Sequence, residues 1–331
     1  MRADDEHRRC AEQTSIIGQG WGLDHFQIAV ASYDQVREVF ATKLGFTVPE
    51  ASKFPAQGAA NAILSLEPAY IEFLWFYDRP KVPFGTGRLD RAVSSGGGPF
   101  HYNLDVSPAE GAATLLLAAG AKARTAPGQN VRHPDGSEEP GLWTTIIVDP
   151  GQTRVLAHAP GGSEVGLIEY RNNVAAARQQ NRERLPDGVQ PDPRRLPGEW
   201  HANTARRLHS VWVAVENVDA AVKQSGRFGL AAVGPERNDA ALGARGREVL
   251  CGSGTIIFWE PSKSDGVVAA LLSKKGPGPF GISVDVADLK RAHDLVEQGV
   301  GTKLPIVKNG DRQSFVVPGA LAANTWVEFA Q

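Results

Sequence analysis

The chain contains very little cysteine: 2 residues among 331. Cys10 lies in a polar segment and Cys251 in an apolar one. Two distant cysteines provide neither a disulfide framework nor the paired spacing of a zinc site. We therefore expect both to be free thiols in a reducing compartment, which favours a cytoplasmic protein.

The chain also lacks an excess of charge and any long apolar run. Lys and Arg number 35 and Asp and Glu 37, for a net charge of -2. This balance gives no reason to expect nucleic acid or an anionic membrane as partner. No stretch approaches the roughly 20 apolar residues of a membrane span. Residues 1–15 are charged and lack the apolar core of a signal peptide.

What the chain does contain is a fourfold repeat. Strand patterns open at 23–30, 98–106, 208–215 and 278–286, and the second and fourth share the letters Gly-Pro-Phe. Further strand patterns close each repeat at 71–73, 168–170, 256–258 and 327–329. Helical patterns follow the opening strands, as where Ser32 precedes Gln35 in the spacing of a capping box. The sequence thus predicts a tandem repeat of four βαβββ units and an α+β fold.

The repeats align pairs of positions in their opening and closing strands. The pairs are His25 and Glu72, His101 and Glu169, Ser210 and Ile257, and Gly281 and Glu328. Three pairs have the separation of residues 25 and 72, which is 47, whereas residues 101 and 169 are 68 apart. The second repeat therefore carries about 21 extra residues, in a stretch rich in turn formers.

Composition divides the chain into two larger parts. We predict a polar tail over 1–20, a first domain over 21–173, a linker over 174–204 and a second domain over 205–331. The linker is rich in Arg, Gln, Asp and Pro. Each domain holds two units, because a single unit cannot bury its own apolar face.

Four tandem βαβββ units paired in this way resemble the vicinal oxygen chelate superfamily, which includes glyoxalase I and the extradiol dioxygenases. The resemblance implies two glyoxalase/bleomycin resistance/dioxygenase-like domains. It also implies a divalent metal ion inside a paired sheet, with ligands from the opening and closing strands. Carried over to this chain, the ligands are His25, Glu72, His101 and Glu169. The equivalent positions of the second domain keep only Glu328, so its site is expected to be degenerate.

The resemblance favours a glyoxalase-like enzyme of the lyase or isomerase type that acts on a small oxygenated organic molecule. The metal, one of Fe, Mn, Ni or Zn, would polarise a substrate oxygen, and Glu72 or Glu169 would act as base. Gln27 and Asn103 each lie two residues after a histidine, so they share its sheet face and are candidates for substrate binding.

Two other functions stay open. An extradiol dioxygenase would use Fe(II) on His25, His101 and Glu169. A resistance-type protein would bind a small molecule without turnover. The carboxylate at Glu72 and the N-terminal place of the site favour the lyase or isomerase. Sequence alone leaves the substrate, the metal and any homo-oligomer undetermined.

Overall fold

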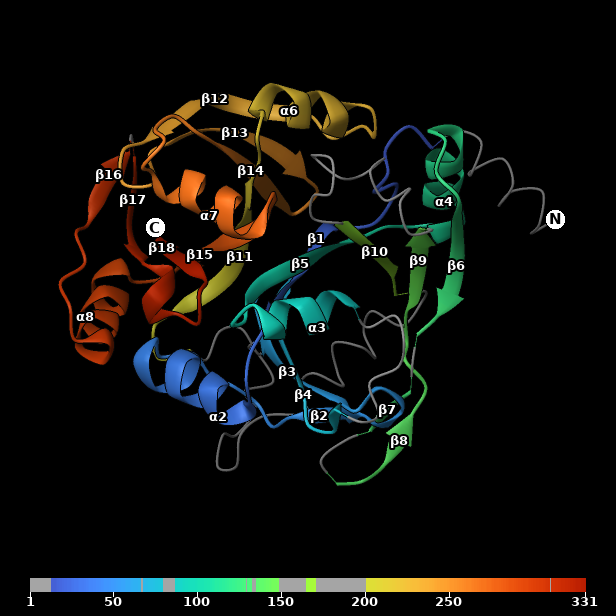
Figure 1. Cartoon of the computed structure of the whole chain (residues 1–331), viewed down its shortest axis with the longest axis horizontal. Coiled ribbons are helices and arrows are strands. Elements are labelled where there is room, and N and C mark those ends of the chain that lie inside the picture. The colour runs from blue at the N-terminus through green and yellow to red at the C-terminus, as the bar shows by residue number, and fades with distance from the viewer. Residues whose placement is uncertain are drawn as a thin grey trace.

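The computed structural model describes residues 13–66, 68–79, 87–128, 130–132, 135–148, 165–170, 201–309 and 311–331. Most of the predicted tail, with Cys10, and the predicted linker up to residue 200 lie outside these ranges. Two curved sheets and the helices packed against them make up the described chain (Figure 1).

The first sheet has ten strands in the order β6-β9-β10-β5-β1-β4-β3-β2-β7-β8. At its centre β1 and β5 run antiparallel, while β4 runs parallel to β1 and β10 parallel to β5. The strands are β1 (Gly22–Ala29), β2 (Ser52–Phe54), β3 (Ala59–Ser65), β4 (Tyr70–Phe76), β5 (Gly98–Asp105), β6 (Ala123–Pro127), β7 (Val131–Arg132), β8 (Glu138–Glu139), β9 (Thr144–Val148) and β10 (Val165–Glu169).

The second sheet repeats this plan with eight strands in the order β12-β13-β14-β11-β15-β18-β17-β16. Its central strands β11 and β15 are antiparallel, flanked by the parallel β14 and β18. The strands are β11 (Ala205–Ala214), β12 (Ala232–Asp239), β13 (Ala244–Cys251), β14 (Gly254–Pro261), β15 (Gly278–Val286), β16 (Val307–Asn309), β17 (Arg312–Val317) and β18 (Trp326–Ala330).

A helix follows the opening strand of each unit, and a further helix joins the two units of each sheet. The first set is α2 (Tyr33–Val36) with the π-helix η1 (Arg37–Lys43), α4 (Ala109–Ala118), α6 (Val218–Gly226) and α8 (Leu289–Val300). The joining helices are α3 (Gly87–Ser94) and α7 (Val267–Lys275). Short 3-10 turns lie at Pro55–Gln57 and Gly319–Leu321. The predicted α+β fold of four paired βαβββ units is confirmed.

The predicted capping box at the start of α2 illustrates how local sequence sets these elements. Ser32 Oγ accepts a hydrogen bond from the Gln35 amide at 3.4 Å, and Gln35 Oε1 accepts one from the Ala31 amide at 2.8 Å. Both bonds satisfy backbone donors that the first helical turn leaves unpaired. The helix therefore begins at a defined residue and turns its apolar side toward the first sheet.

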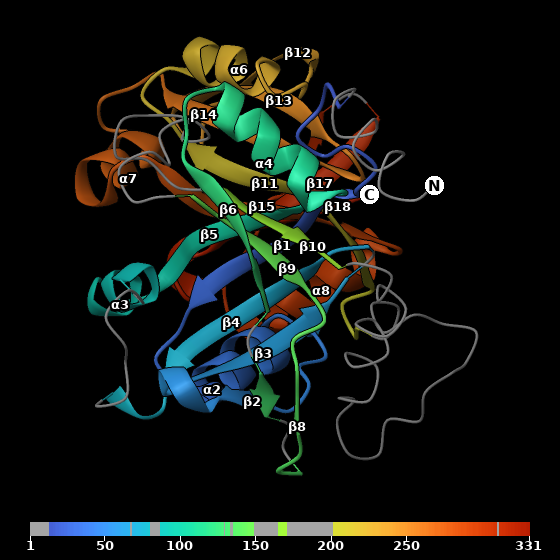
Figure 2. The ribbon, with the colours of Figure 1, turned by 90° about the vertical axis from the view of Figure 1, so that its right-hand side faces the viewer.

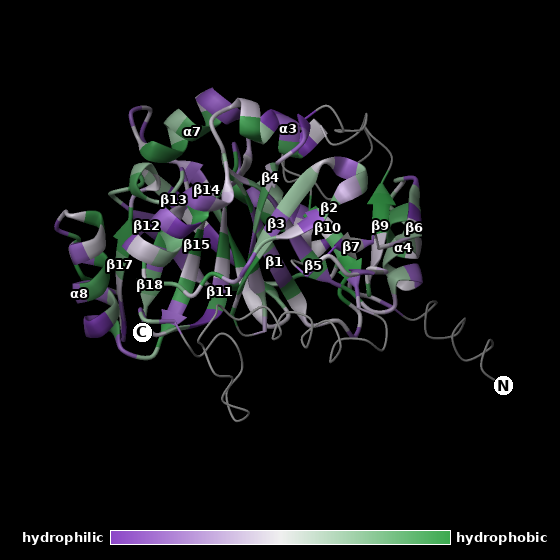
Figure 3. Ribbon diagram, turned by 90° about the horizontal axis from the view of Figure 1, so that it is seen from below, coloured by the Kyte–Doolittle hydropathy of each residue, from purple (hydrophilic) through white to green (hydrophobic). Residues whose placement is uncertain are grey.

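The core lies between the sheets and their helices, and hydrophobic residues concentrate in the strands (Figure 3). Phe40 of the π-helix packs on Phe73 of β4, with ring centroids 4.4 Å apart. In the second half, α6 and α8 pack on one face of the sheet and α7 packs on the other. Figure 2 shows α6 and α7 above the strands β3 and β4 of the first half. Within the ranges that the structure describes, no helix has the length and apolar character needed to cross a membrane.

The two sheets contact each other directly. Gly22 and Gly252 form a β-bridge, and a Cβ on either residue would come within 2.1 Å of the opposite backbone. Phe46 stacks on Phe329, with centroids 5.7 Å apart. His201 Nδ1 accepts from the Thr47 amide at 2.9 Å, and burial lowers the pKa of His201 to about 4. The imidazole therefore joins the two halves in its neutral form.

Candidate active site

The strand register brings three predicted site residues to the centre of the first sheet. Gln27 of β1 lies opposite Glu72 of β4 on one side and opposite His101 of β5 on the other. His25 of β1 lies opposite Asn103 of β5. All of these side chains except that of Gln27 are buried.

His25 is held in one orientation by its neighbours. Its Nδ1 lies 2.5 Å from Asp24 Oδ2, and its ring stacks on Tyr70 with centroids 4.5 Å apart. Its Nε2 lies 2.6 Å from Asn103 Nδ2 and 3.6 Å from Glu72 Oε2. The network assigns the ring proton to Nδ1, which donates to Asp24, so Nε2 accepts from the Asn103 amide. The basic nitrogen therefore faces the polar centre.

Glu72 has a partner for each carboxylate oxygen. Gln27 Nε2 donates to Oε2 at 2.7 Å, and Asn61 Nδ2 donates to Oε1 at 2.8 Å. A buried carboxylate is costly unless it accepts hydrogen bonds, and the two amides meet that requirement. They also fix the plane of the carboxylate, with one oxygen directed toward His25.

Two tyrosines form a second layer behind His25. The hydroxyl groups of Tyr70 and Tyr170 lie 2.9 Å apart, and the Tyr170 hydroxyl donates to Asp24 Oδ2 at 3.3 Å. Burial, assisted by neighbouring acidic groups, raises the pKa of both phenols well above the usual value. Both therefore stay protonated, and Tyr170 helps to hold the carboxylate that orients His25.

His101 points toward Arg88 of α3. The guanidinium nitrogen NH1 of Arg88 lies 3.2 Å from each ring nitrogen of His101. His101 thus shares the sheet centre with His25 and Glu72 through its place opposite Gln27, while its ring faces a cation.

Glu169, the fourth predicted ligand, lies at the N-terminus of α4. Its Oε2 accepts from the Ala109 amide at 3.2 Å, and its Oε1 accepts from Ser107 Oγ at 3.3 Å. A carboxylate at this end of a helix pairs with free backbone amides and with the positive end of the helix dipole. In this structure Glu169 therefore caps a helix.

Gly166 occupies the position on β10 that corresponds to Glu72 on β4. It lies opposite Asn103, as Glu72 lies opposite Gln27, so the register differs by three residues from the predicted alignment. A Cβ at residue 166 would come within 1.8 Å of Asn103 Oδ1 and 2.5 Å of His101 Nε2. Only glycine leaves room for both side chains here.

The residues can be compared with the needs of a divalent metal. Two imidazoles and a carboxylate are suitable ligand types for Fe, Mn, Ni or Zn. Among the described residues, however, no group of three or more His, Cys, Asp or Glu side chains lies close enough together to hold a metal ion. Metal ligation by His25, Glu72, His101 and Glu169 therefore stays a prediction.

The equivalent centre of the second sheet is aromatic. Trp212 of β11 lies opposite both Ile257 and Gly281, and it packs against Trp259 and Phe280 with ring centroids 5.9 and 5.8 Å away. Its Nε1 donates to Ser283 Oγ at 2.9 Å. The hydroxyl of Ser283 in turn donates to Glu328, the carboxylate at the closing-strand position. An indole fills the space that polar side chains occupy in the first sheet.

Sequence reasoning missed several residues around His25 and Glu72. Asp24 had a signal in the sequence, since it directly precedes His25. Tyr70 also had one, since it precedes Glu72 by two residues on β4 and so shares its sheet face. Asn61 and Arg88 had none, because they reach the centre from a strand and a helix without another predicted site residue. Only the strand register identifies Gly166.

Comparison with known proteins places this chain in a family. A family model described as a glyoxalase-like domain matches residues 23–229. A mutant of 4-hydroxymandelate synthase from Streptomyces coelicolor has a similar fold, with 14% identity, a TM-score of 0.58 and coverage of 94% of this chain and 92% of that one. A hypothetical protein from Staphylococcus aureus has 9% identity, a TM-score of 0.59 and coverage of 93% and 98%.

A shorter structure also matches. Methylmalonyl-CoA epimerase from Mycobacterium tuberculosis has 20% identity and a TM-score of 0.35, covering 38% of this chain and 92% of that one. The search of curated proteins gave no significant match.

Proposed function

Because the chain belongs to the glyoxalase-like domain family of the vicinal oxygen chelate superfamily, we propose that it is a metal-dependent enzyme of the lyase or isomerase type. It acts on a small oxygenated organic molecule at the centre formed by β1, β4 and β5. One observation carries the proposal: Asp24 orients His25 so that its Nε2 lies 3.6 Å from the buried Glu72 carboxylate.

The metal would be held by His25, Glu72 and His101, which come from three adjacent strands. A carboxylate on the far nitrogen of a histidine is a common second partner of metal-binding imidazoles, and Asp24 has that relation to His25. Ligation by His101 requires its ring to turn away from Arg88. When bound, the metal would supply Lewis-acid polarisation of a substrate oxygen. Glu169 has no part in this proposal, because Gly166 and not Glu169 occupies the position on β10 that corresponds to Glu72 on β4.

The chain's own residues would carry the proton. In the role of general base, which is the alternative to its role as a metal ligand, Glu72 would take a proton from the carbon next to a substrate carbonyl group, since it is the carboxylate held at the centre. Gln27 and Asn61 keep that carboxylate in one plane. Asn103 exchanges its hydrogen bond to His25 for one to a substrate oxygen, which orients the substrate.

The first test is metal content. Protein purified without chelator is analysed for Fe, Mn, Ni and Zn, for wild type and for His25→Ala, His101→Ala and Glu72→Gln. Either histidine substitution should remove most of the metal. Glu328→Gln in the second sheet is the matched control and should keep it. Full metal retention in both histidine variants would refute the assignment.

The second test is turnover. Wild type and Glu72→Gln are screened on α-ketoaldehyde adducts, hydroxy acids and catechols, with and without O₂. Loss of the general base should lower the rate about 10²–10⁴-fold. Turnover that depends on O₂ and survives Glu72→Gln would indicate a dioxygenase instead.

A second candidate function is the binding of a small molecule without metal or turnover. The amides support it: Asn103 occupies His25 Nε2, and Gln27 and Asn61 occupy both oxygens of Glu72. The centre is therefore satisfied by protein groups alone. Wild-type protein without bound metal that binds a compound from the same panel but does not turn it over would favour this function.

A further inference from the structure

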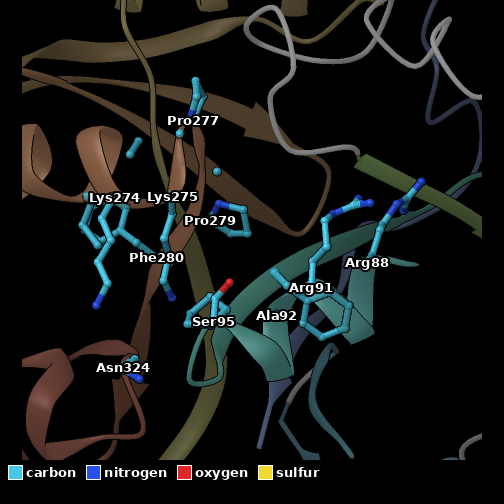
Figure 4. A pocket seen from close by; sticks show the side chains of 16 residues that line it. Arg88, Arg91, Ala92, Ser95, Lys274, Lys275, Pro277, Pro279, Phe280 and Asn324 are labelled. Carbon is cyan, nitrogen blue, oxygen red and sulfur yellow. The ribbon is translucent and has the colours of Figure 1, made fainter. Parts of the chain in front are cut away.

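A basic cleft of about 320 Å³ lies between the joining helices α3 and α7. Figure 4 shows Arg88 and Arg91 on one side, Lys274 and Lys275 on the other, and Ser95 between them. None of the sixteen residues that line the cleft is an Asp or a Glu. Asp90, the carboxylate on α3, pairs with Arg79, which does not line the cleft.

The cleft is built from the repeated sequence. The sequence Gly-Pro-Phe occurs at residues 98–100 and 278–280, at the starts of β5 and β15, and the Pro and Phe of both copies line the cleft. The helices that precede these strands are α3 and α7, which lie on the same side of the molecule (Figure 3). The segment from α3 to β5 in the first sheet and the equivalent segment from α7 to β15 in the second sheet thus meet at the cleft.

Specific contacts fix the floor of the cleft. Gly97 and Gly98 have φ angles of 80° and 101°, which favour glycine. Lys275 Nζ donates to the Gly97 carbonyl at 3.1 Å, and Asn324 Nδ2 donates to the Gly96 carbonyl at 3.0 Å. A Cβ on Gly98 would come within 2.9 Å of Asn324 Cβ. The second half of the chain is therefore anchored on the backbone of the first.

Helix geometry accounts for only part of this charge. Arg91, Lys274 and Lys275 lie in the last turns of their helices, where cations are favoured. Each helix end contributes roughly half a negative charge, whereas the cleft holds four cations. Removal of surrounding water and the neighbouring Lys274 lower the pKa of Lys275, as expected where positive charges are crowded.

We propose that this cleft binds a small organic anion with at least two negative charges, in particular a phosphoryl group. Arginine forks match phosphate oxygens in pairs, and lysines add point charges. The volume is at the lower end of the range for small-molecule sites. This inference goes beyond the proposed reaction and does not depend on the metal.

Arg88 connects the cleft with the centre of the first sheet, so the phosphoryl group has two possible sources. Arg88 lines the cleft and also contacts His101. The group could belong to the substrate of the reaction centre or to a separate ligand. The experiment includes an arm for each source.

The test is isothermal titration of the full chain with pyrophosphate. Lys274→Gln/Lys275→Gln should weaken binding at least about 10-fold, which is about 1.4 kcal/mol. Lys290→Gln/Lys303→Gln removes the same charge from exposed positions outside the cleft and should bind like wild type. Added KCl should weaken wild-type binding, because screening reduces attraction between charges.

Arg91→Gln guards against misfolding, because the contacts that fix the floor are made by Lys275 and Asn324 and not by Arg91. It should weaken binding while its thermal unfolding midpoint stays near that of wild type. Absence of pyrophosphate binding to wild type, or equal loss in the cleft and control variants, would overturn the proposal.

The second arm uses 3-phosphoglycerate as a phosphorylated hydroxy acid. If one ligand spans both places, His101→Ala should weaken its binding and leave pyrophosphate binding unchanged. If the ligand is separate, His101→Ala should affect neither. Both results support the anion site, and both come from binding measurements that need neither a turnover assay nor a metal analysis.

Discussion

Asp105 should make the folded state progressively less stable as the pH rises from 4 to 8. This carboxyl lies at the end of β5, is buried, and accepts a hydrogen bond from the Trp21 amide at 2.9 Å. Burial is the main cause that raises its pKa, from 3.8 to about 7; backbone hydrogen bonds oppose the rise, and the Asp24 and Glu169 charges add to it. The folded chain therefore holds a proton on Asp105 that the unfolded chain releases near pH 4.

The sign and the size follow from proton linkage. Between pH 3.8 and about 7 the folded state binds more protons, so the free energy of unfolding falls with pH, and it levels off above 7. The difference between the two pKa values corresponds to about 4 kcal/mol, and relaxation around the ionised group lowers this to about 2–4 kcal/mol. Asp105→Asn keeps the acceptor for Trp21 but cannot ionise.

The assay is urea unfolding of wild type and Asp105→Asn at intervals from pH 4 to pH 8. The stability of the variant relative to wild type should rise by about 2–4 kcal/mol across this range. Asp265→Asn, at an exposed position, is the control for the loss of one carboxylate from the surface. A relative stability of Asp105→Asn that is flat with pH would refute the reasoning, whatever the absolute stabilities.

Three further outcomes can be checked on the same protein. Gly166→Ala should destabilise the fold by about 1–3 kcal/mol in urea unfolding, because the added methyl group would overlap two side chains. Gly234→Ala is the control for steric overlap, because no atom lies within 4 Å of the added Cβ; its positive φ angle contributes only backbone strain. Trp212→Ala should cost about 3–5 kcal/mol by the same assay, since it empties the aromatic centre of the second sheet. The Cys251 thiol should react with a thiol reagent only after unfolding, because it is fully buried and burial raises its pKa to about 12; fast labelling of folded Cys10→Ser protein would contradict this.

The repeat in the sequence predicted the fold well because it is local information. Opening strands, capped helices and closing strands each lie within a few dozen residues, and their apolar patterns recur four times. In the structure His25 lies opposite Tyr70 and Gln27 lies opposite Glu72, and His25 Nε2 is 3.6 Å from Glu72 Oε2. The residue types in a strand were enough to align the repeats wherever the number of residues between the opening and the closing strand was constant.

The second unit shows where such reasoning stops. Its closing strand follows the insertion, so spacing no longer fixes the register, and the match of Ile-Glu-Tyr to Ile-Glu-Phe favoured Glu169. Strand register depends on contacts across the sheet, and these place Gly166 opposite Asn103. Arg88 beside His101 was equally hidden, because α3 reaches the site from outside the repeat pattern.

The contact between the two sheets has a thermodynamic consequence. The first sheet buries His25, Asn61, Glu72 and Asn103, and desolvation of such polar groups offsets much of what their hydrogen bonds contribute to folding. The second sheet carries an aromatic centre at the corresponding place and is joined to the first through the Gly22–Gly252 bridge. Its apolar burial can therefore supply cooperative stability to a neighbour whose own centre is polar. The two halves thus differ in how their centres contribute to the free energy of folding, although they share one plan of strands.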